Sequence, residues 1–277
     1  MTAPPNTMSS AISFHHPSFD PDAEVCEALE TAHELTRFHR ATMPRRARKI
    51  ARFLQDPACL RAATTLRSPT AADILIALPE TVLPDTSLAA ALQNRCSARR
   101  EALTGGPDLA QLSTVLHMAV RANRIVTPAV APDAAFHHRP YPSAGALYPC
   151  ELYVIRPDAP PYRYDARRHC LVDYGQPVRP FASVETGPSG LPEPCVLIIT
   201  AELARATGKY GGRGYRFAAL EAGHLSQNLL LAAAAVGLPA LGYGSYFDAE
   251  LEDLLGVDPL GEPVMAVILL GGNTNIN

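Results

Sequence analysis

The stretch KYGGRGYRFAALEAGHLSQNLLLAAAAVG, residues 209–237, joins a polar, glycine-rich start to a long apolar run. Residues 215–237 are almost wholly apolar, which predicts a long helix. Gly237 stands where a helix C-terminal cap belongs, and Pro239 follows it, so the helix should end there. A helix that is apolar on all sides is buried, often at a subunit interface. We therefore expect this helix to be buried.

Two proton-carrying side chains, Lys209 and Tyr210, stand just before this helix. The glycines at 211, 212 and 214 permit a tight entry into it. One interpretation is a polar surface turn, with the lysine reaching into solvent. The other is an active site in which the lysine abstracts a proton and the tyrosine donates or relays one. These residues alone leave both interpretations open.

The rest of the chain mixes helical and strand patterns, which favours an α+β fold over a doubly wound sheet. Apolar spacing predicts an early helix over residues 22–40 and a second, after Pro44, that carries Ile50, Phe53 and Leu54. Residues 68–86 are punctuated by prolines and indicate an extended connector. Further helices are expected at 85–100, 105–123 and 247–257, and strands at 149–157, 161–175, 195–203 and 262–272. Residues 1–20 are expected to be frayed.

Composition narrows the class of protein. The 277 residues are 47% hydrophobic and carry a net charge of −3, as expected of a soluble globular protein that does not bind nucleic acid. The basic run at 45–49 is interpreted as a solvated helix face. Six cysteines without a CxxC pair indicate reduced thiols. With no secretory signal and no apolar run long enough to span a bilayer, we expect a cytoplasmic protein. The histidine pairs at 15–16 and 137–138 lack partners for a metal site.

Two further segments could carry chemistry. In NRCSARR, residues 94–100, the alternating Arg95, Ser97 and Arg99 would point the same way if the segment is extended. Two guanidinium groups and a hydroxyl on one side suit a phosphate, although a charged helix C-terminus is an equally plain interpretation. The small, rigid run Pro142, Ser143, Ala144 and Gly145 could let a flat ligand approach the backbone, or could be an ordinary loop before a strand.

In order and spacing, these segments resemble the SagB-type dehydrogenases, flavin enzymes of the nitroreductase superfamily. The specific parts are PSAGALYP and the KYGxRGYRxxxxEAGHxxQN pattern, together with GYGSYF and a final strand ending in LGG. LTRFHRATM and ALPETVLPDTSLAAAL resemble the upstream region of that family. The resemblance implies a nitroreductase-like α+β fold with a mostly antiparallel sheet, in a homodimer with FMN at the interface. It divides the chain into an N-terminal helical extension, residues 1–80, and an FMN-binding domain, residues 81–277.

The resemblance also implies roles for single residues. Arg95, Ser97 and Arg99 match the motif that holds the FMN phosphate. Three groups of residues match positions that line the flavin. The partner subunit would contribute Pro142, Ser143, Ala144 and Gly145. The other two groups are Tyr243, Gly244 and Ser245, and the polar Gln227 and Asn228. Lys209 and Tyr210 match the catalytic pair of members that oxidise azolines. Two departures concern phosphate binding: Cys96 stands where the family usually has a second arginine, and the chain stops soon after Gly272, where many relatives place a basic residue.

The implied activity is oxidation of a peptide-derived thiazoline or oxazoline to the thiazole or oxazole in natural-product biosynthesis. The substrate could be free, bound to a carrier domain or presented on a leader peptide, and a cyclising or carrier-domain partner is an expected companion. Two alternatives stay open: an FMN-dependent desaturase of another amino-acid or peptide-derived substrate, and a flavin-containing scaffold subunit of a peptide-modifying complex. Residues 1–80 could close over the substrate channel or engage the carrier or leader.

Overall fold

The computed structural model describes residues 23–65, 67–187 and 190–272. The expectations for residues 1–20, for the histidine pair at 15–16 and for the residues after Gly272 lie outside this part of the chain. The helices are α1 (Ala23–Leu35), α2 (Met43–Gln55), α3 (Pro57–Thr64), α4 (Leu88–Asn94), α5 (Leu109–Ala119), α6 (Leu203–Tyr210), α7 (Arg213–Ala235) and α8 (Asp248–Leu255). The strands are β1 (Ile74–Ala77), β2 (Arg124–Val126), β3 (Phe136–His138), β4 (Cys150–Ile155), β5 (Tyr162–Asp165), β6 (Cys170–Asp173), β7 (Cys195–Ala201), β8 (Ala240–Tyr243) and β9 (Val264–Leu270).

Seven strands form one sheet in the order β1-β6-β5-β4-β7-β9-β8, and each neighbouring pair is antiparallel. The predicted α+β fold with a mostly antiparallel sheet is therefore confirmed. Strands β4 and β7 lie at the centre of the sheet and are buried at every position. Their mostly apolar sequences suit strands that are covered on both faces of the sheet. A separate two-stranded sheet, β2-β3, was not predicted.

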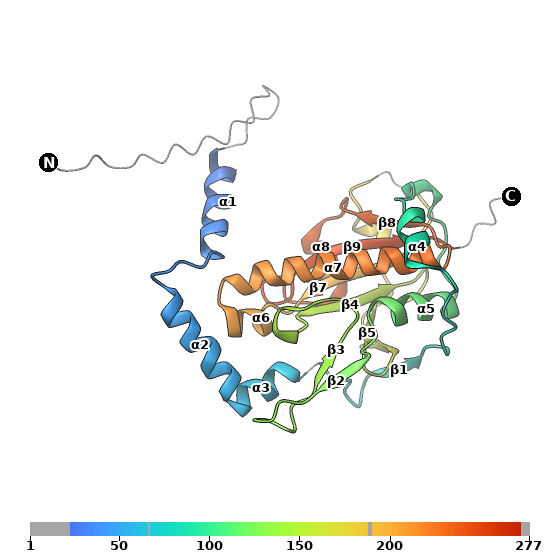
Figure 1. Ribbon diagram of the computed structural model, residues 1–277. Helices are drawn as coiled ribbons and strands as arrows, with labels where there is room; N and C mark the ends of the chain where they lie inside the picture. The colour runs from blue at the N-terminus through green and yellow to red at the C-terminus, as the bar shows by residue number, and fades with distance from the viewer. Residues whose placement is uncertain (1–22, 66, 188–189, 273–277) are drawn as a thin grey trace.

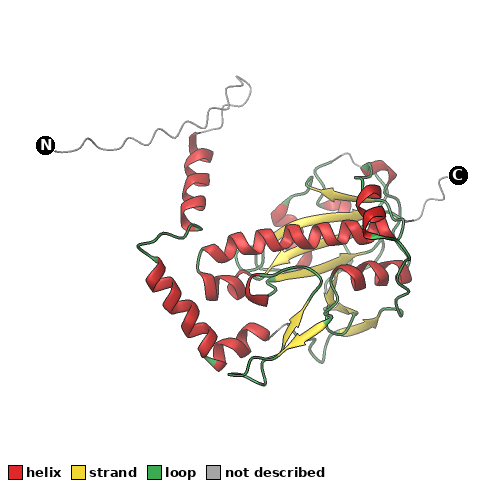
Figure 2. Cartoon of the chain, viewed as in Figure 1, coloured by secondary structure: helices red, strands yellow, loops and turns green. Residues whose placement is uncertain are grey.

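Helices cover both faces of the large sheet. On one face, α5 and α7 pack their buried side chains, such as Leu116 and Leu225, against β4 and β7 (Figure 1). On the other face, Leu251 and Leu255 of α8 close a second cluster. Figure 2 shows α7, the longest of the described helices, lying over the sheet. The site is thus built on a helix fixed against a rigid sheet.

The predicted long helix exists, but it is not buried on all sides. Ala218, Leu225 and Leu229 are fully buried against the sheet, whereas Tyr215 is 50% and Leu220 is 54% exposed. The expectation of a wholly buried helix is therefore wrong for the single chain. Its second apolar face lies open, as a face that meets another subunit would.

The N-terminal helices extend from one end of α7. Figure 1 shows α1 standing away from the sheet, while α2 passes α6 and α3 lies beside the small β2-β3 sheet. The turn between α1 and α2 is fixed to the start of α7, where the Arg213 guanidinium donates to the Thr36 carbonyl oxygen at 3.1 Å. The strand β1, which was not predicted within the connector, joins the edge of the sheet through β6. No helix in the described part of the chain is both long and apolar enough to cross a bilayer.

Candidate functional site

The Lys209 ammonium nitrogen and the Tyr210 hydroxyl converge above Gly145. A Cβ atom at Gly145 would lie 2.6 Å from Lys209 Nζ and 2.6 Å from the Tyr210 hydroxyl oxygen, so only glycine leaves room for both groups. The backbone at Gly145 also has φ +68°, a left-handed conformation that glycine adopts without strain. Two sequence segments more than sixty residues apart therefore meet at one point.

The lysine and tyrosine do not lie in a turn, as the surface interpretation required. They form the last turn of α6, which ends at Gly211 with φ +62°. Lys209 is only 5% exposed. The Tyr210 ring packs edge-on against Phe217 at 5.0 Å between ring centroids, which orients the hydroxyl.

Aromatic rings surround the lysine. Its Nζ lies 5.4 Å from the centre of the Phe53 ring, contributed by α2, and 5.1 Å from that of Tyr210. Within the described residues no carboxylate forms an ion pair with it. The chain contains only two lysines, Lys49 and Lys209. The basic side chains that form ion pairs with carboxylates in this structure are mostly arginines. An amine can give up its proton and a guanidinium cannot, so a lysine suits a site that moves protons.

The loop beneath this pair is strained and firmly held. Besides Gly145, the non-glycine residues Ala146 and Tyr148 have positive φ, at 54° and 45°. The Tyr148 amide donates to the Ser143 hydroxyl at 2.9 Å, and Arg205 donates to the Tyr148 carbonyl oxygen at 3.0 Å. The Pro-Ser-Ala-Gly loop is thus held in place directly beneath Lys209 and Tyr210.

Sequence analysis missed Glu221, which supports the loop from α7. This carboxyl group is 2% exposed and accepts a hydrogen bond from the Cys150 amide at 3.2 Å. Burial raises the pKa of Glu221, and hydrogen bonds from Ser143 and Cys150 oppose that rise. An acidic residue in the middle of an apolar helix was the signal that could have identified it.

The phosphate-type residues lie elsewhere on the same chain. Arg95, Ser97 and Arg99 belong to an extended segment beside β8, in which the Ala98 amide donates to the Ala240 carbonyl oxygen at 2.9 Å. The extended backbone fits the expected alternation. Within the described residues, neither guanidinium group and no hydroxyl of this set has a hydrogen-bond or ion-pair partner.

The next arginine in the same segment has a different role. Arg100 is buried and donates twice to Glu185, at 2.9 and 2.8 Å, so it stabilises the fold. Tyr243 lies beside that pair and packs edge-on against Phe181. The Ser245 carbonyl oxygen accepts from the Thr186 amide at 2.9 Å, which fixes the loop after β8. The segment 243–245 is therefore at the same end of the molecule as the phosphate-type residues.

These two groups of residues lie at opposite ends of α7. Helix α6, with the lysine and tyrosine, stands at its start, and α4 stands at its end, where the Thr86 hydroxyl donates to the Ala235 carbonyl oxygen at 2.9 Å (Figure 1). The 23 residues of α7 measure about 34 Å. The two groups of candidate residues are therefore separated by most of the length of α7.

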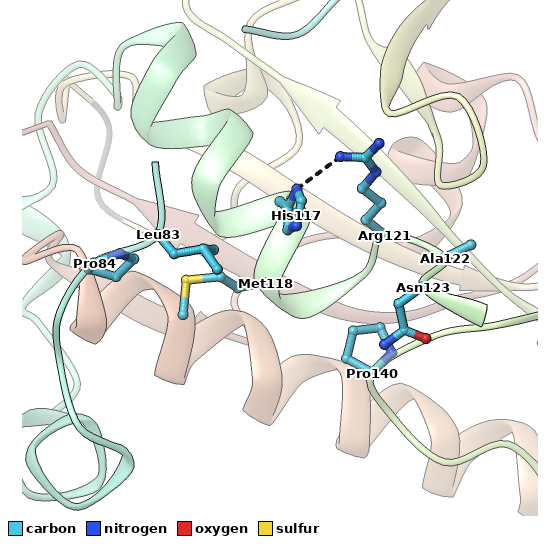
Figure 3. A pocket seen from close by; sticks show the side chains of 8 residues that line it. All are labelled: Leu83, Pro84, His117, Met118, Arg121, Ala122, Asn123 and Pro140. Atoms are coloured by element: carbon cyan, nitrogen blue, oxygen red, sulfur yellow. Dashed lines mark hydrogen bonds between the residues drawn. The ribbon is translucent and has the colours of Figure 1, made fainter. Parts of the chain in front are cut away.

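The polar pair on α7 lies between these ends. Gln227 is exposed and Asn228 is half-buried. A separate pocket of about 550 Å³ lies beside α5, lined by Leu83, Pro84, His117, Met118, Arg121, Ala122, Asn123 and Pro140 (Figure 3). Arg121 approaches His117 Nδ1 at 3.1 Å, and burial, with the charge of Arg121, lowers the pKa of His117. None of the predicted site residues lines this pocket.

An antiparallel sheet covered by helices on both faces, with the long helix α7 packed against its centre, is the fold of the nitroreductase-like α+β proteins. Residues 92–272 match the model of the nitroreductase family. The chain belongs to the nitroreductase family. Members of this family typically bind a flavin and catalyse redox reactions.

Two curated relatives match part of the chain. One is "Putative nitroreductase MJ1384" of Methanocaldococcus jannaschii, 34% identical over 127 residues, which are 42% of this chain and 63% of the relative. The other is "Microcin B17-processing protein McbC" of Escherichia coli, 30% identical over 142 residues, 46% of this chain and 52% of the relative. The chain thus matches less than two thirds of the length of either relative.

Solved structures agree with the fold. A protein from Ralstonia eutropha, described as a putative nitroreductase, superposes with a TM-score of 0.57 at 24% identity, covering 75% of this chain and 93% of the other. A chain of the E. coli microcin synthetase McbBCD complex, solved with truncated pro-MccB17 bound, has a TM-score of 0.52 at 20% identity, covering 92% and 95%. At these identities the likeness shows the fold alone.

Proposed function

We propose that this protein is an FMN-dependent oxidase that converts a peptide-derived thiazoline or oxazoline into the aromatic thiazole or oxazole. The observation that carries the proposal is the meeting of Lys209 Nζ and the Tyr210 hydroxyl above Gly145. A base and a second proton carrier at one point suit the removal of an acidic ring proton. The relation to McbC, a microcin-processing protein, supports a substrate made from a peptide.

In this proposal FMN binds between two copies of the chain. One copy holds the phosphate with Arg95, Ser97 and Arg99 and lines the flavin with Tyr243, Gly244 and Ser245. The partner supplies the platform Pro142, Ser143, Ala144 and Gly145 together with the catalytic pair. The free guanidinium groups at one end of α7 and the glycine-lined platform at the other end support this division. Gln227 and Asn228 are proposed flavin contacts on α7.

The chemistry assigned to the chain's own residues is limited and specific. Aromatisation of an azoline removes two hydrogens from the ring, one as a proton and one with its electron pair. Bound FMN would supply the acceptor for that electron pair. The amine of Lys209 takes the proton, and none of the described carboxylates forms an ion pair with it. Tyr210 orients the ring through its hydroxyl, and Phe53 helps to exclude water.

The test uses the purified protein loaded with FMN and a synthetic thiazoline peptide. Turnover appears in mass spectrometry as the loss of two hydrogen atoms. Lys209→Ala and Lys209→Arg are both expected to reduce kcat at least about 100-fold, the lower range for a lost general base, while the visible spectrum shows bound FMN. Tyr162→Phe, on strand β5, is the control and should keep full activity. Full turnover by Lys209→Ala with FMN bound would exclude the assigned role.

Two outcomes would favour other functions. Rapid bleaching of the flavin by NADPH alone, without any thiazoline oxidation, would indicate a general nitroreductase. Turnover that appears only after a partner protein is added, and that survives Lys209→Ala, would indicate the scaffold subunit. In either case the pair above Gly145 would have a structural role.

A further inference from the structure

Helix α2 carries an exposed basic face. Its 13 residues include five basic side chains and no acidic one, in a chain whose net charge is −3. Arg45, Arg48, Lys49 and Arg52 recur at intervals of three and four, so they share one side of the helix. All four are exposed, and none forms an ion pair within the described residues. We call these four residues the basic face.

One border of the basic face contacts the catalytic region. The Phe53 ring lies over Lys209 Nζ, and Lys49, a member of the basic face, donates from Nζ to the Thr207 carbonyl oxygen in the last turn of α6 at 3.5 Å. Figure 1 shows α2 running past α6 at the edge of the molecule. A molecule bound to the basic face would therefore lie within reach of the candidate active site.

Among the described residues, no member of the basic face forms an ion pair, and Lys49 alone reaches another element, through its contact with Thr207. Arginines that stabilise the chain elsewhere are buried in ion pairs, such as Arg100 with Glu185 and Arg205 with Glu151. No residue of α2 is buried. A shallow hollow of about 420 Å³ opens on this helix, lined by Arg48, Ala51, Arg52, Gln55 and Asp56. Two unpaired guanidinium groups, Arg48 and Arg52, outnumber the one carboxylate, Asp56, that lines this hollow, and with Arg45 and Lys49 nearby the surface is complementary to a negatively charged one.

We propose that the basic face docks an acidic polypeptide that bears the azoline covalently, and so delivers the ring past Phe53 to Lys209. The inference rests on the proposed function for the nature of the cargo, whereas the docking itself rests on α2. A tethered substrate gains from such a surface because binding of the polypeptide raises the effective concentration of the ring at the active site. Charge attraction also accelerates the encounter, most strongly at low salt.

The probes are two synthetic thiazoline peptides of equal length, one with a tail of glutamates and one with a tail of serine and glycine. The enzyme is the full chain with FMN bound. The test variant is Arg48→Gln with Arg52→Gln. The control variant is Arg156→Gln with Arg179→Gln, which removes the same charge from two arginines that line a different hollow; because Arg179 pairs with Asp253 at 2.8 Å, it also controls for the loss of an ion pair. The measurements are kcat/KM for each peptide and the Kd of each labelled tail without the thiazoline.

The glutamate-tailed peptide should have the higher kcat/KM and bind more tightly, with an advantage that shrinks as salt rises. In the test variant, the ratio of kcat/KM for the glutamate-tailed peptide to kcat/KM for the neutral-tailed peptide should be about fivefold smaller, as expected for the loss of two exposed ion pairs. Activity on the neutral-tailed peptide should be unchanged. The control variant should match the wild type.

Other results separate the two proposals. Oxidation of both peptides at equal kcat/KM would overturn the docking site and leave the proposed function intact. Tail binding that depends on Arg48 and Arg52, without any oxidation, would overturn the proposed function and support the docking site. Tighter binding of a single-stranded oligonucleotide of equal charge would assign the face to nucleic acid. Dissociation of a dimer by the test variant would assign it to a second copy of the chain.

Discussion

Gly145 shows how one residue can decide a site. It adopts a left-handed backbone, and its missing side chain leaves the space that Lys209 and Tyr210 occupy. All three residues could be predicted as candidate site residues from the sequence, because the Pro-Ser-Ala-Gly run and the Lys-Tyr pair are distinctive. The sequence could not show that they meet, since contact between residues 145 and 209 depends on the packing of α6 beside β4. Glu221 and Phe53 were not predicted as site residues for the same reason, because their importance depends on the residues that lie next to them in space.

Gly145→Ala should therefore lower kcat/KM more than tenfold with only a small loss of stability. The new methyl group would displace the mobile ends of Lys209 and Tyr210, which costs little folding energy but moves the reactive atoms. Gly105→Ala is the matched control, because Gly105 has a similar φ of +62° and nothing within 4 Å of the added carbon. Both variants should lose about 1 kcal/mol of unfolding free energy from backbone strain. Equal kinetics in the two variants would mean that the reactive pair does not work at Gly145.

At the scale of elements, hydrophobic pattern predicted the large features and missed the small ones. The buried strand β7 has a continuous apolar run, the long helix α7 is mostly apolar, and the predicted helix at 105–123 is present as α5, which starts with a capping box at Asp108. The short β2 is exposed at all three positions, so it carries no apolar alternation to detect. Helix α6 is polar and contains a glycine, and its contacts with α7 rather than its own propensity stabilise it.

The open face of α7 is the element we expect to join two copies. Tyr215 and Leu220 are about half exposed, and the small Ala219 and Gly223 beside them allow a close approach. Leu220→Glu should place a charge in that interface, so the protein should run as a monomer and lose bound FMN. Light scattering after size exclusion and the visible spectrum measure both effects. The control is Leu260→Glu, at a leucine that is 86% exposed in a loop, which should stay dimeric. A dimeric Leu220→Glu protein with full FMN content would place the interface elsewhere.

For the whole molecule, the decisive fact is the separation of the two groups of site residues by the length of α7. The resemblance implies that the Pro-Ser-Ala-Gly loop comes from the partner subunit, but a sequence motif has no direction in space, so it could not show that the Arg-Ser-Arg segment and the Lys-Tyr pair lie at different ends of α7. The antiparallel sheet was predictable from its strands. The arrangement of the N-terminal helices was not, because they bury few side chains and their position depends on contacts such as that of Arg213 with Thr36.

This separation predicts complementation between two inactive variants. Lys209→Ala chains keep the phosphate residues, and chains with Arg95→Ala and Arg99→Ala keep the catalytic pair. A mixed dimer contains one site made of two intact groups and one site made of two damaged groups. With random mixing, half the dimers are mixed, so activity per chain should return to about a quarter of the wild-type value. The measurement is thiazoline turnover after the two proteins are unfolded together and refolded. Absence of any recovery, with mixed dimers present, would contradict a site shared between subunits.

The scarcity of lysine has a practical consequence for chemical modification. Lys49 and Lys209 are the only side-chain amines, one on an open helix and one enclosed by aromatic rings. Reagents that acylate amines therefore have two side-chain targets of very different accessibility, apart from the chain's amino terminus. A single labelling reaction, read by peptide mapping, would report on the surface of α2 and on the interior of the site as two separate signals.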